Sequence, residues 1–369
     1  MTAPHMMVDI IAGARPNFMK IAPIIRAFEK VRGRGSRLTY RLVHTGQHYD
    51  SRMSGDFFEQ LGIPEPHVNL AVGSGTQAEQ TGAIMTRYEA LLLKERSAAC
   101  LVVGDVTSTM ACAIAAQKLL VPVGHVEGGI RSGDWTMPEE INRLVTDAVS
   151  NWFFTTSEVA NANLRHSGVG EDRIFFVGNT MIDTLLSNMD RLRPPSFWSE
   201  RGLKERNYLV ATLHRPANVD QPHTLARILS VIAEEAAGVP VVFPVHPRTA
   251  KTIAAMGDSI RDLVLVDPQP YLEFNFLVRH SLGVITDSGG VTEETTVMGV
   301  PCMTARDTTE RPETVTIGTN ELVGTDPEAL RPALKRLLAG QWKRGGIPEL
   351  WDGGAGGRIV EHLDRLLLR

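Results

Sequence analysis

Short apolar segments alternate with longer amphipathic segments along the first half of the chain. The apolar segments have the length of buried β-strands, and they lie at Val8–Ala12, Leu42–His44, Cys100–Val103, Val121–Val126, Trp152–Thr155 and Phe175–Val177. The amphipathic segments repeat apolar residues every three or four positions, and they span Phe18–Val31, Ala78–Lys94, Ser108–Leu120 and Glu139–Val149. This alternation predicts repeated βα units and a parallel sheet.

The pattern breaks at Arg191–Arg206, a charged segment with two adjacent prolines that disfavours regular structure. It then restarts, with strands expected at Tyr208–Thr212, Val239–Phe243, Leu263–Val266, Gly283–Thr286 and Pro301–Met303. We predict an α/β protein of two domains, residues 1–180 and 181–356, with a C-terminal helix, residues 357–369, that packs back on the first domain. Because parallel sheets bind ligands beyond the carboxyl ends of their strands, two facing sheets would line one cleft.

The composition disfavours some kinds of binding partner and indicates the cellular compartment. Of the 369 residues, 43% are hydrophobic and 22% are charged, with a formal net charge of -4, which favours neither nucleic acid nor an anionic membrane. Cys100, Cys112 and Cys302 lie in or beside apolar runs, which indicates reduced, buried thiols. Neither a signal peptide nor an apolar stretch of roughly 20 residues is evident, so we expect a cytoplasmic protein.

The first expected strand ends in a glycine turn, Gly13–Lys20, that also opens a helix and carries Arg15 and Lys20. Backbone amides at a helix N-terminus together with one or two cations suit a diphosphate. The turn matches neither the glycine pattern of dinucleotide-binding proteins nor a P-loop. A tight turn with a solvated Arg15 is the alternative interpretation.

Carboxylates gather where two further strands end and where one helix begins. Asp105 follows the strand that ends at Val103, Glu127 follows the next strand, and Glu139 stands four residues before Arg143 on one helix face. An exposed ion pair between Glu139 and Arg143 is one interpretation of that spacing. The other is acid-base chemistry, which needs carboxylates held in environments that push their pKa values apart.

In the second half, His214 and His246 each follow an expected strand. Metal ligation is an alternative for both, but no carboxylate or third histidine stands at a suitable spacing, so general acid or phosphate-contact roles are favoured. Ser288, Gly289 and Gly290 form a small-residue turn at a helix start that could hold a diphosphate, and Glu294 could accept both ribose hydroxyls. The turn could instead only relieve backbone strain.

These blocks, in this order, resemble the non-hydrolysing UDP-N-acetylglucosamine 2-epimerases of bacteria and archaea. The resemblance is carried by the series GARPNFMK, TGQHYD, GDVTST, HVEGGIRSGD, PEEINR, LHRPAN, PVHP, TDSGGVTEE and RDTTERPE. It implies two Rossmann-like domains as in GT-B glycosyltransferases, a homodimer, and no metal or nicotinamide cofactor. It also implies anti elimination of UDP to 2-acetamidoglucal, followed by re-addition on the other face to give the manno epimer.

The resemblance assigns roles to individual residues. The catalytic positions are Asp105, Glu127, Glu139 and His214. The substrate-binding positions are Arg15, Lys20, Gln47, His48, Arg143, His246, Phe274, Ser288, Gly289, Gly290, Glu294 and Arg311. Among these, Phe274 matches the aromatic residue beside uracil, and Arg311 lies in the charged loop near the sugar and phosphates.

Three departures limit the transfer. Asn17 and Gly128 stand where much of the family has glutamate and alanine. The stretch from Gly133 to Pro138 is two residues shorter than in the best-known bacterial members, as also occurs in epimerases of 2,3-diacetamido sugars. The regions matching a second, activating UDP-sugar site read His48–Asp50 and Val72–Gln77 without an arginine, so we expect substrate activation to be absent or built differently.

Several alternatives remain open at this point. A UDP-2,3-diacetamido-2,3-dideoxy hexose or its uronate could be the substrate, although the run Thr309–Glu313 favours UDP-N-acetylglucosamine. A GT-B glycosyltransferase would need an acceptor groove but not three carboxylates and His214. A non-enzymatic nucleotide-sugar sensor and a hydrolysing relative are the other two.

Overall fold

The computed structural model describes residues 5–46, 60–245, 249, 253 and 263–368, without the side chains of Arg15, Pro16, Pro216 and Ala217. Contacts divide the chain into two compact units. Unit 1 comprises Met1–Ser187 and Glu349–Arg369, and unit 2 comprises Asn188–Pro348. The predicted boundary after residue 180 would cut one helix, Thr180–Asn188, behind its first residue.

Among its described residues, unit 1 has a parallel sheet of seven strands in the order β3-β2-β1-β4-β5-β6-β7. The strands are β1 Met6–Ala12, β2 Leu38–His44, β3 Val68–Asn69, β4 Ala99–Val103, β5 Val123–Val126, β6 Trp152–Thr155 and β7 Ile174–Phe176. The helices are α1 Arg15–Arg32, α3 Gln77–Lys94, α4 Thr107–Lys118, α5 Pro138–Val149, α6 Glu158–His166, α7 Thr180–Asn188 and α16 Ala355–Leu367. A single-turn 3-10 helix spans Glu171–Arg173.

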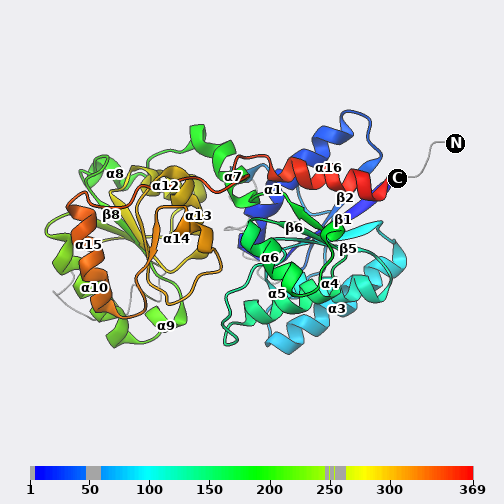
Figure 1. The fold of residues 1–369 in the computed structure, drawn as a ribbon, viewed down its shortest axis with the longest axis horizontal. Helices are drawn as coiled ribbons and strands as arrows, with labels where there is room; N and C mark the ends of the chain where they lie inside the picture. Colours follow the sequence, from blue (N-terminus) through cyan, green and yellow to red (C-terminus); the bar gives the residue numbers. More distant parts are fainter. Residues whose placement is uncertain (1–4, 47–59, 246–248, 250–252, 254–262, 369) are drawn as a thin grey trace. The chain divides into compact units, whose positions relative to one another are not determined.

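Helices cover both faces of this sheet. Helices α3, α4 and α5 pack in a row on one face, and α1 packs against α16 on the other (Figure 1). The C-terminal helix is tied down by Asp183, whose carboxylate accepts the backbone N–H groups of Ala355 and Gly356 at 3.1 and 2.7 Å. Chain segments that are far apart in sequence therefore complete one core.

Unit 2 has a parallel sheet whose described strands follow the order β10-β9-β8-β11-β12-β13. The strands are β8 Leu209–Thr212, β9 Val241–Pro244, β10 Leu263–Val266, β11 Gly283–Thr286, β12 Cys302–Thr304 and β13 Asn320–Leu322. The helices are α8 Phe197–Glu200, α9 Pro216–Val219, α10 Pro222–Ala236, α12 Tyr271–His280, α13 Gly289–Met298, α14 Pro312–Thr316 and α15 Leu330–Leu338. Short 3-10 helices span Met189–Arg191 and Pro327–Ala329.

Alternating strand residues feed two separate apolar clusters in unit 2. Leu209 and Ala211 of β8 point to the cluster under α10 and α15, whereas Tyr208 and Val210 point to the cluster under α12 and α13. Burial on both faces explains why the strands read as continuous apolar runs. The predicted class, two α/β units with parallel sheets, is confirmed.

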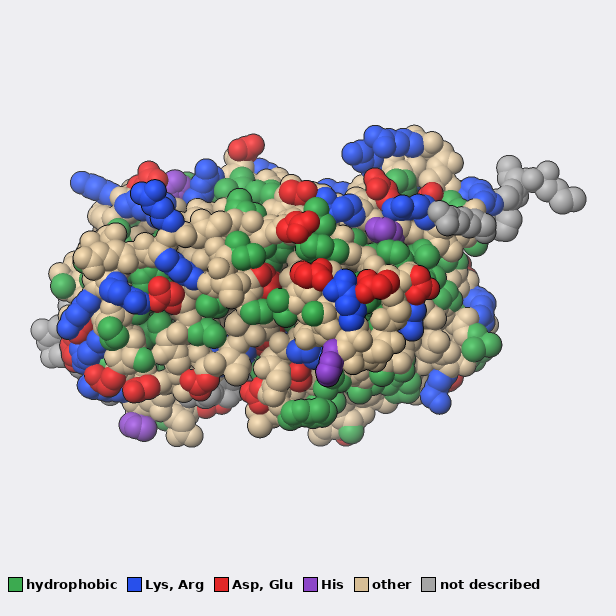
Figure 2. Space-filling model, viewed as in Figure 1, with side chains coloured by type: hydrophobic (Ala, Val, Ile, Leu, Met, Phe, Trp, Pro, Cys, Tyr) green, Lys and Arg blue, Asp and Glu red, His purple; other side chains and the backbone are tan. Residues whose placement is uncertain are grey.

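Charge is distributed evenly over the visible surface. Acidic and basic side chains are interspersed there, without one large patch of a single sign (Figure 2). No helix among the described residues is both long and apolar enough to cross a membrane. The same residues contain no group of three or more His, Cys, Asp or Glu side chains that could hold a metal ion.

Candidate functional site

In unit 1, the turn after β1 is organised by Asn17. Its side-chain oxygen accepts the N–H groups of Gly13 and Ala14, both at 3.1 Å, and its amide nitrogen donates to the carbonyl of Val103 at 2.8 Å. The side chain thereby caps α1 and ties the β1 turn to the end of β4. Strands β1 and β4 flank the point where strand order reverses, which is the usual ligand edge of such a sheet.

Lys20 and Glu127 form a buried ion pair at this edge. The Lys20 ammonium lies 2.7 Å from Oε2 of Glu127, with side-chain exposures of 12% and 3%. A Cβ added at Gly104 would lie 3.1 Å from the same ammonium, so the turn after β4 also reaches this pair. The structure thus brings together two predicted site residues, Lys20 and Glu127, from elements more than a hundred residues apart.

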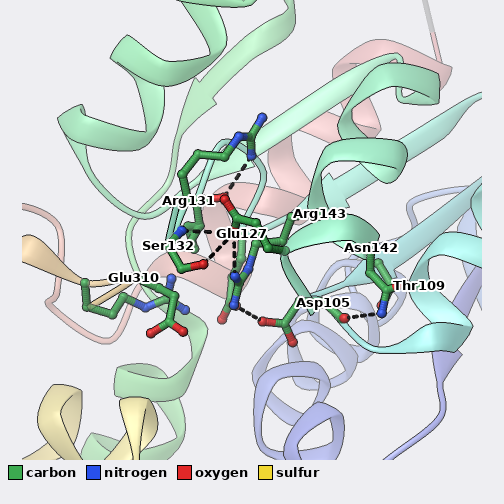
Figure 3. A network of polar contacts seen from close by, with 12 residues as sticks. Asp105, Thr109, Glu127, Arg131, Ser132, Asn142, Arg143 and Glu310 are labelled. Atoms are coloured by element: carbon green, nitrogen blue, oxygen red, sulfur yellow. Dashed lines mark hydrogen bonds and ion pairs between the residues drawn. The ribbon is translucent and has the colours of Figure 1, made fainter. Parts of the chain in front are cut away.

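Arg143 of α5 binds two acidic residues, and Figure 3 shows its contact with Asp105. Its guanidinium lies 2.5 Å from Oδ2 of Asp105 and 2.8 Å from Oε2 of Glu140. Asn142 donates to the backbone carbonyl of Asp105 at 2.8 Å. Arg143 is only 5% exposed, so the interpretation of an exposed helix ion pair is wrong. The contacts instead fix the Asp105 turn against α5.

Glu140 is a residue that the sequence analysis missed. Its carboxylate accepts the N–H groups of Ser132 and Gly133 at 2.9 and 3.0 Å, as well as the Arg143 bond. Burial opposes ionisation of Glu140, but these hydrogen bonds outweigh burial and lower its pKa. Its neighbour Glu139 is exposed in the first turn of α5. Glu140 therefore anchors the loop that contains Ser132 and Gly133, and Glu139 remains accessible to a ligand.

In unit 2, His214 is held by Asp287, a second residue that the analysis missed. Nδ1 of His214 lies 2.8 Å from Oδ1 of Asp287; the histidine side chain is 62% exposed and Asp287 is 0% exposed. Asp287 also accepts the backbone N–H groups of His214 and Arg215 and the amide of Asn218. Burial opposes its ionisation, but the contacts with His214, Asn218 and Arg215 outweigh burial and lower its pKa. Because Nδ1 is engaged, Nε2 is the nitrogen that His214 offers to a ligand.

The loop after β11 leads into α13 at Ser288, Gly289 and Gly290. Ser288 occupies the N-cap position but does not cap the helix through its side chain. The N-terminal N–H groups of a ten-residue helix are thus placed beside a hydroxyl, which suits an anion. Both β8 and β11 lie at the centre of the unit 2 sheet, where strand order reverses.

Glu294, one turn further along α13, is 4% exposed. Burial raises its pKa to about 7, although its interactions with Tyr271 and Asn275 act in the opposite direction. Asn275 lies 3.3 Å from Oε1 of Glu294. Phe274, on the same helix as Asn275, is half-buried against the apolar cluster below α12. The carboxyl of Glu294 is therefore close to balance between its two protonation states near neutral pH.

The loop after β12 contains two buried arginine–glutamate pairs. Arg311 forms an ion pair with Glu293 of α13. Arg306, which the prediction omitted, binds both oxygens of Glu310 at 2.8 Å. Buried ion pairs of this kind hold a loop in one geometry. The side chain of Arg15 and the predicted residues Gln47, His48 and His246 lie outside the described part of the structure.

Two α/β units, each built on a parallel sheet, define the class of GT-B-like folds. A solved Medicago truncatula protein complexed with UDP-glucose has this fold in common with the chain, at a TM-score of 0.60 and 8% identity over 99% of each chain. The sequence model for "UDP-N-acetylglucosamine 2-epimerase" matches residues 30–364. The chain belongs to the UDP-N-acetylglucosamine 2-epimerase family, which confirms the resemblance.

The individual relatives cover nearly the whole chain. The UDP-N-acetylglucosamine 2-epimerase of Methanocaldococcus jannaschii is 40% identical over 97% of this chain and 99% of its own length. A crystal structure from that organism, in complex with UDP-GlcNAc and UDP, has a TM-score of 0.86 at 39% identity, covering 98% of this chain and 100% of its own. The UDP-2,3-diacetamido-2,3-dideoxy-D-glucuronate 2-epimerase of Pseudomonas aeruginosa is also 40% identical, over 98% and 100%.

Proposed function

We propose that this enzyme interconverts UDP-N-acetylglucosamine and its C2 epimer by elimination and re-addition of UDP. The chain belongs to this family, and one observation carries the proposal. Asp105 and Glu127 lie at the ligand edge of one sheet, where Arg143 pairs with Asp105 and Lys20 pairs with Glu127. The C2 proton of a sugar is barely acidic, so its removal needs a positioned base and assistance to the leaving group. Unit 1 supplies the carboxylates for proton transfer.

Unit 2 supplies the groups for the nucleotide. Ser288, Gly289 and Gly290 bind the diphosphate at the N-terminus of α13, and Glu294 accepts the ribose hydroxyls. His214, oriented by Asp287, assists the diphosphate as it leaves. Support for UDP as the nucleotide comes from the Methanocaldococcus jannaschii structure, which contains UDP-GlcNAc and UDP. Phe274 lies beside uracil, and Arg311 beside the sugar and phosphates.

Glu127→Gln tests the assignment of the chemistry to unit 1. The amide cannot take or return a proton, so conversion of UDP-N-acetylglucosamine is expected to fall by about 100-fold or more, because general acid-base catalysis contributes that much. The affinity for UDP, measured by calorimetry, is expected to stay within about twofold of the wild type, since unit 2 is unchanged. Conversion at the wild-type rate would remove Glu127 from the mechanism.

A second candidate substrate is a UDP-2,3-diacetamido-2,3-dideoxy uronate. It is favoured by the Pseudomonas aeruginosa relative, whose identity to this chain equals that of the Methanocaldococcus jannaschii enzyme. The shortened loop Gly133–Pro138 also favours this substrate, because epimerases of 2,3-diacetamido sugars share the short loop. Comparing kcat/KM for both sugars decides: the proposed assignment requires the higher value for UDP-N-acetylglucosamine.

The remaining expectations are a cytoplasmic homodimer that needs no metal. Cys100, Cys112 and Cys302 are unpaired and buried, which supports a reducing compartment. Sedimentation velocity tests the dimer, for which a single species of twice the 40.4 kDa chain mass is expected. Activity that survives extensive dialysis against a chelator supports catalysis without a metal.

A further inference from the structure

Asp147 on α5 is a buried carboxylate at which three segments of unit 1 meet. It is 7% exposed. Its Oδ1 lies 2.6 Å from Nδ1 of His125, and its Oδ2 lies 2.6 Å from the Arg131 guanidinium and 3.0 Å from the backbone nitrogen of Gly129. Burial opposes ionisation, but the contacts with His125 and Arg131 outweigh burial and lower its pKa. Asp147 is thus an anion bound by donors on both sides of Glu127 in sequence.

His125 connects Asp147 to the turn after β4, which contains Gly104. It is fully buried, and its Nε2 lies 2.9 Å from the backbone carbonyl of Gly104. A carbonyl oxygen only accepts hydrogen bonds, so Nε2 carries a proton. Its Nδ1 faces the Asp147 carboxylate, so the ring bridges that carboxylate and the Gly104 carbonyl. Asp147 is thereby linked through one side chain to the residue that precedes Asp105.

The turns after β4 and β5 contain backbone conformations that persist only when neighbouring groups hold them in place. Glu127 has a φ of 71°, a left-handed conformation that is unfavourable for a non-glycine residue and persists only where the surroundings enforce it. Gly104 and Gly129 have φ values of 70° and 81°. A Cβ at Gly129 would lie 2.4 Å from the carbonyl of Ala160, so this turn has no room to relax. The strained residue is the one whose carboxylate is assigned to the chemistry.

We propose that Asp147 and His125 are positioning residues that set the two turns carrying Asp105 and Glu127. The inference rests on the proposed function, because it assumes that those two carboxylates act on the substrate. Asp147 fixes Gly129 directly and holds Gly104 through His125. Neither residue touches the substrate; each acts through the backbone that presents a carboxylate.

The test compares Asp147→Asn and His125→Gln with a matched control, Asp183→Asn. Asp183 is also a buried carboxylate of unit 1, 5% exposed, that accepts two backbone N–H groups, but it holds α16 rather than the catalytic turns. For each purified full-length variant, kcat and KM for C2 epimerisation, the Kd for UDP and the melting temperature are measured. Assays are run well below the lowest melting temperature.

For Asp147→Asn and His125→Gln we expect kcat to fall about 10- to 100-fold, as misplaced catalytic groups require, with the Kd for UDP within about twofold of the wild type. Asp183→Asn is expected to keep kcat within about twofold of the wild type, because it leaves the catalytic turns unchanged. Wild-type kcat in either test variant would overturn the proposal, and so would an equal loss of kcat in the control. A wild type that does not epimerise refutes the proposed function instead.

Discussion

At the scale of single residues, buried carboxylates of this enzyme occupy opposite electrostatic environments. Asp287 and Glu140 accept several hydrogen bonds and have lowered pKa values, so they are fixed anions that orient His214 and Arg143. Glu294 is equally buried with weaker compensation, and its pKa is raised to about 7. Burial is common to all three, and the number and charge of the donors decides the sign of the shift.

Glu294→Gln separates binding from stability. The folded pKa of about 7 lies above the ordinary value of 4.5, so ionised Glu294 opposes folding above pH 7, and this cost disappears as the pH falls toward 4.5. We therefore expect Glu294→Gln to stabilise the ligand-free protein at pH 8 by at most about 3 kcal/mol. The gain should shrink toward pH 5 in denaturant titrations at both pH values.

Ionisation of Glu294, which opposes folding, should favour the binding of UDP. The ribose hydroxyls donate to the ionised form of Glu294, so wild-type affinity should weaken as pH falls from 8 to 6, and Glu294→Gln should bind UDP about tenfold more weakly at pH 8. The ratio of the Kd of Glu294→Gln to the Kd of the wild type should be smaller at pH 6 than at pH 8. Titration of UDP itself affects both proteins alike and cancels in this ratio. A constant ratio would show that Glu294 is not the ribose contact.

At the scale of elements, the close contact between α1 and α16 gives a matched pair of substitutions. A Cβ added at Gly356 would lie 2.7 Å from the backbone of Pro23, whereas one added at Gly357 meets nothing within 4 Å. Gly356→Ala is expected to cost about 1–3 kcal/mol, because two packed backbones must separate. Gly357→Ala is expected to be neutral or to stabilise by up to about 1 kcal/mol. Equal melting temperatures for the two variants would contradict this packing.

Elements were predictable where burial left an unambiguous pattern. Strands β1 and β4 are buried on both faces and read as apolar runs, whereas β13 reads Asn-Glu-Leu and gave no signal. Pro122 cannot donate to a ladder, so β5 begins at Val123 and not at the predicted Val121.

The site was predicted in part, for a related physical reason. Asp105 and Glu127 lie just after β4 and β5, where ligands are expected, so the sequence alone selects them; their role in the chemistry stays a prediction. Asp147, Glu140 and Asn142 were missed because α5 buries polar residues, while periodicity assumes that a helix buries apolar ones. Which of two adjacent glutamates, Glu139 or Glu140, turns inward depends on the tertiary contacts of the Ser132 loop.

At the scale of the whole molecule, the chain distributes its chemistry over two sheets of the same design. Each unit places its polar residues after the strands where strand order reverses, β1 and β4 in unit 1 and β8 and β11 in unit 2. In the proposed mechanism, the carboxylates of unit 1 transfer the proton and the N-terminus of α13 in unit 2 binds the nucleotide.

The kinetics of the whole enzyme should be simple. Val72–Gln77 contains no arginine to bind the phosphates of a second UDP-sugar, so the initial rate should rise hyperbolically with UDP-N-acetylglucosamine as the only ligand. A sigmoidal curve that becomes hyperbolic when trace UDP-N-acetylglucosamine is added to another UDP-sugar substrate would show that an activating site exists in another form.

The most direct test of epimerisation by elimination is isotope exchange. The enzyme is incubated with UDP-N-acetylglucosamine in heavy water without any acceptor, and C2 is followed by NMR. The account predicts deuterium at C2 of both the recovered substrate and its manno epimer, with UDP still attached to each. A manno product that retains its original C2 hydrogen, or release of the free sugar with UDP, would contradict it.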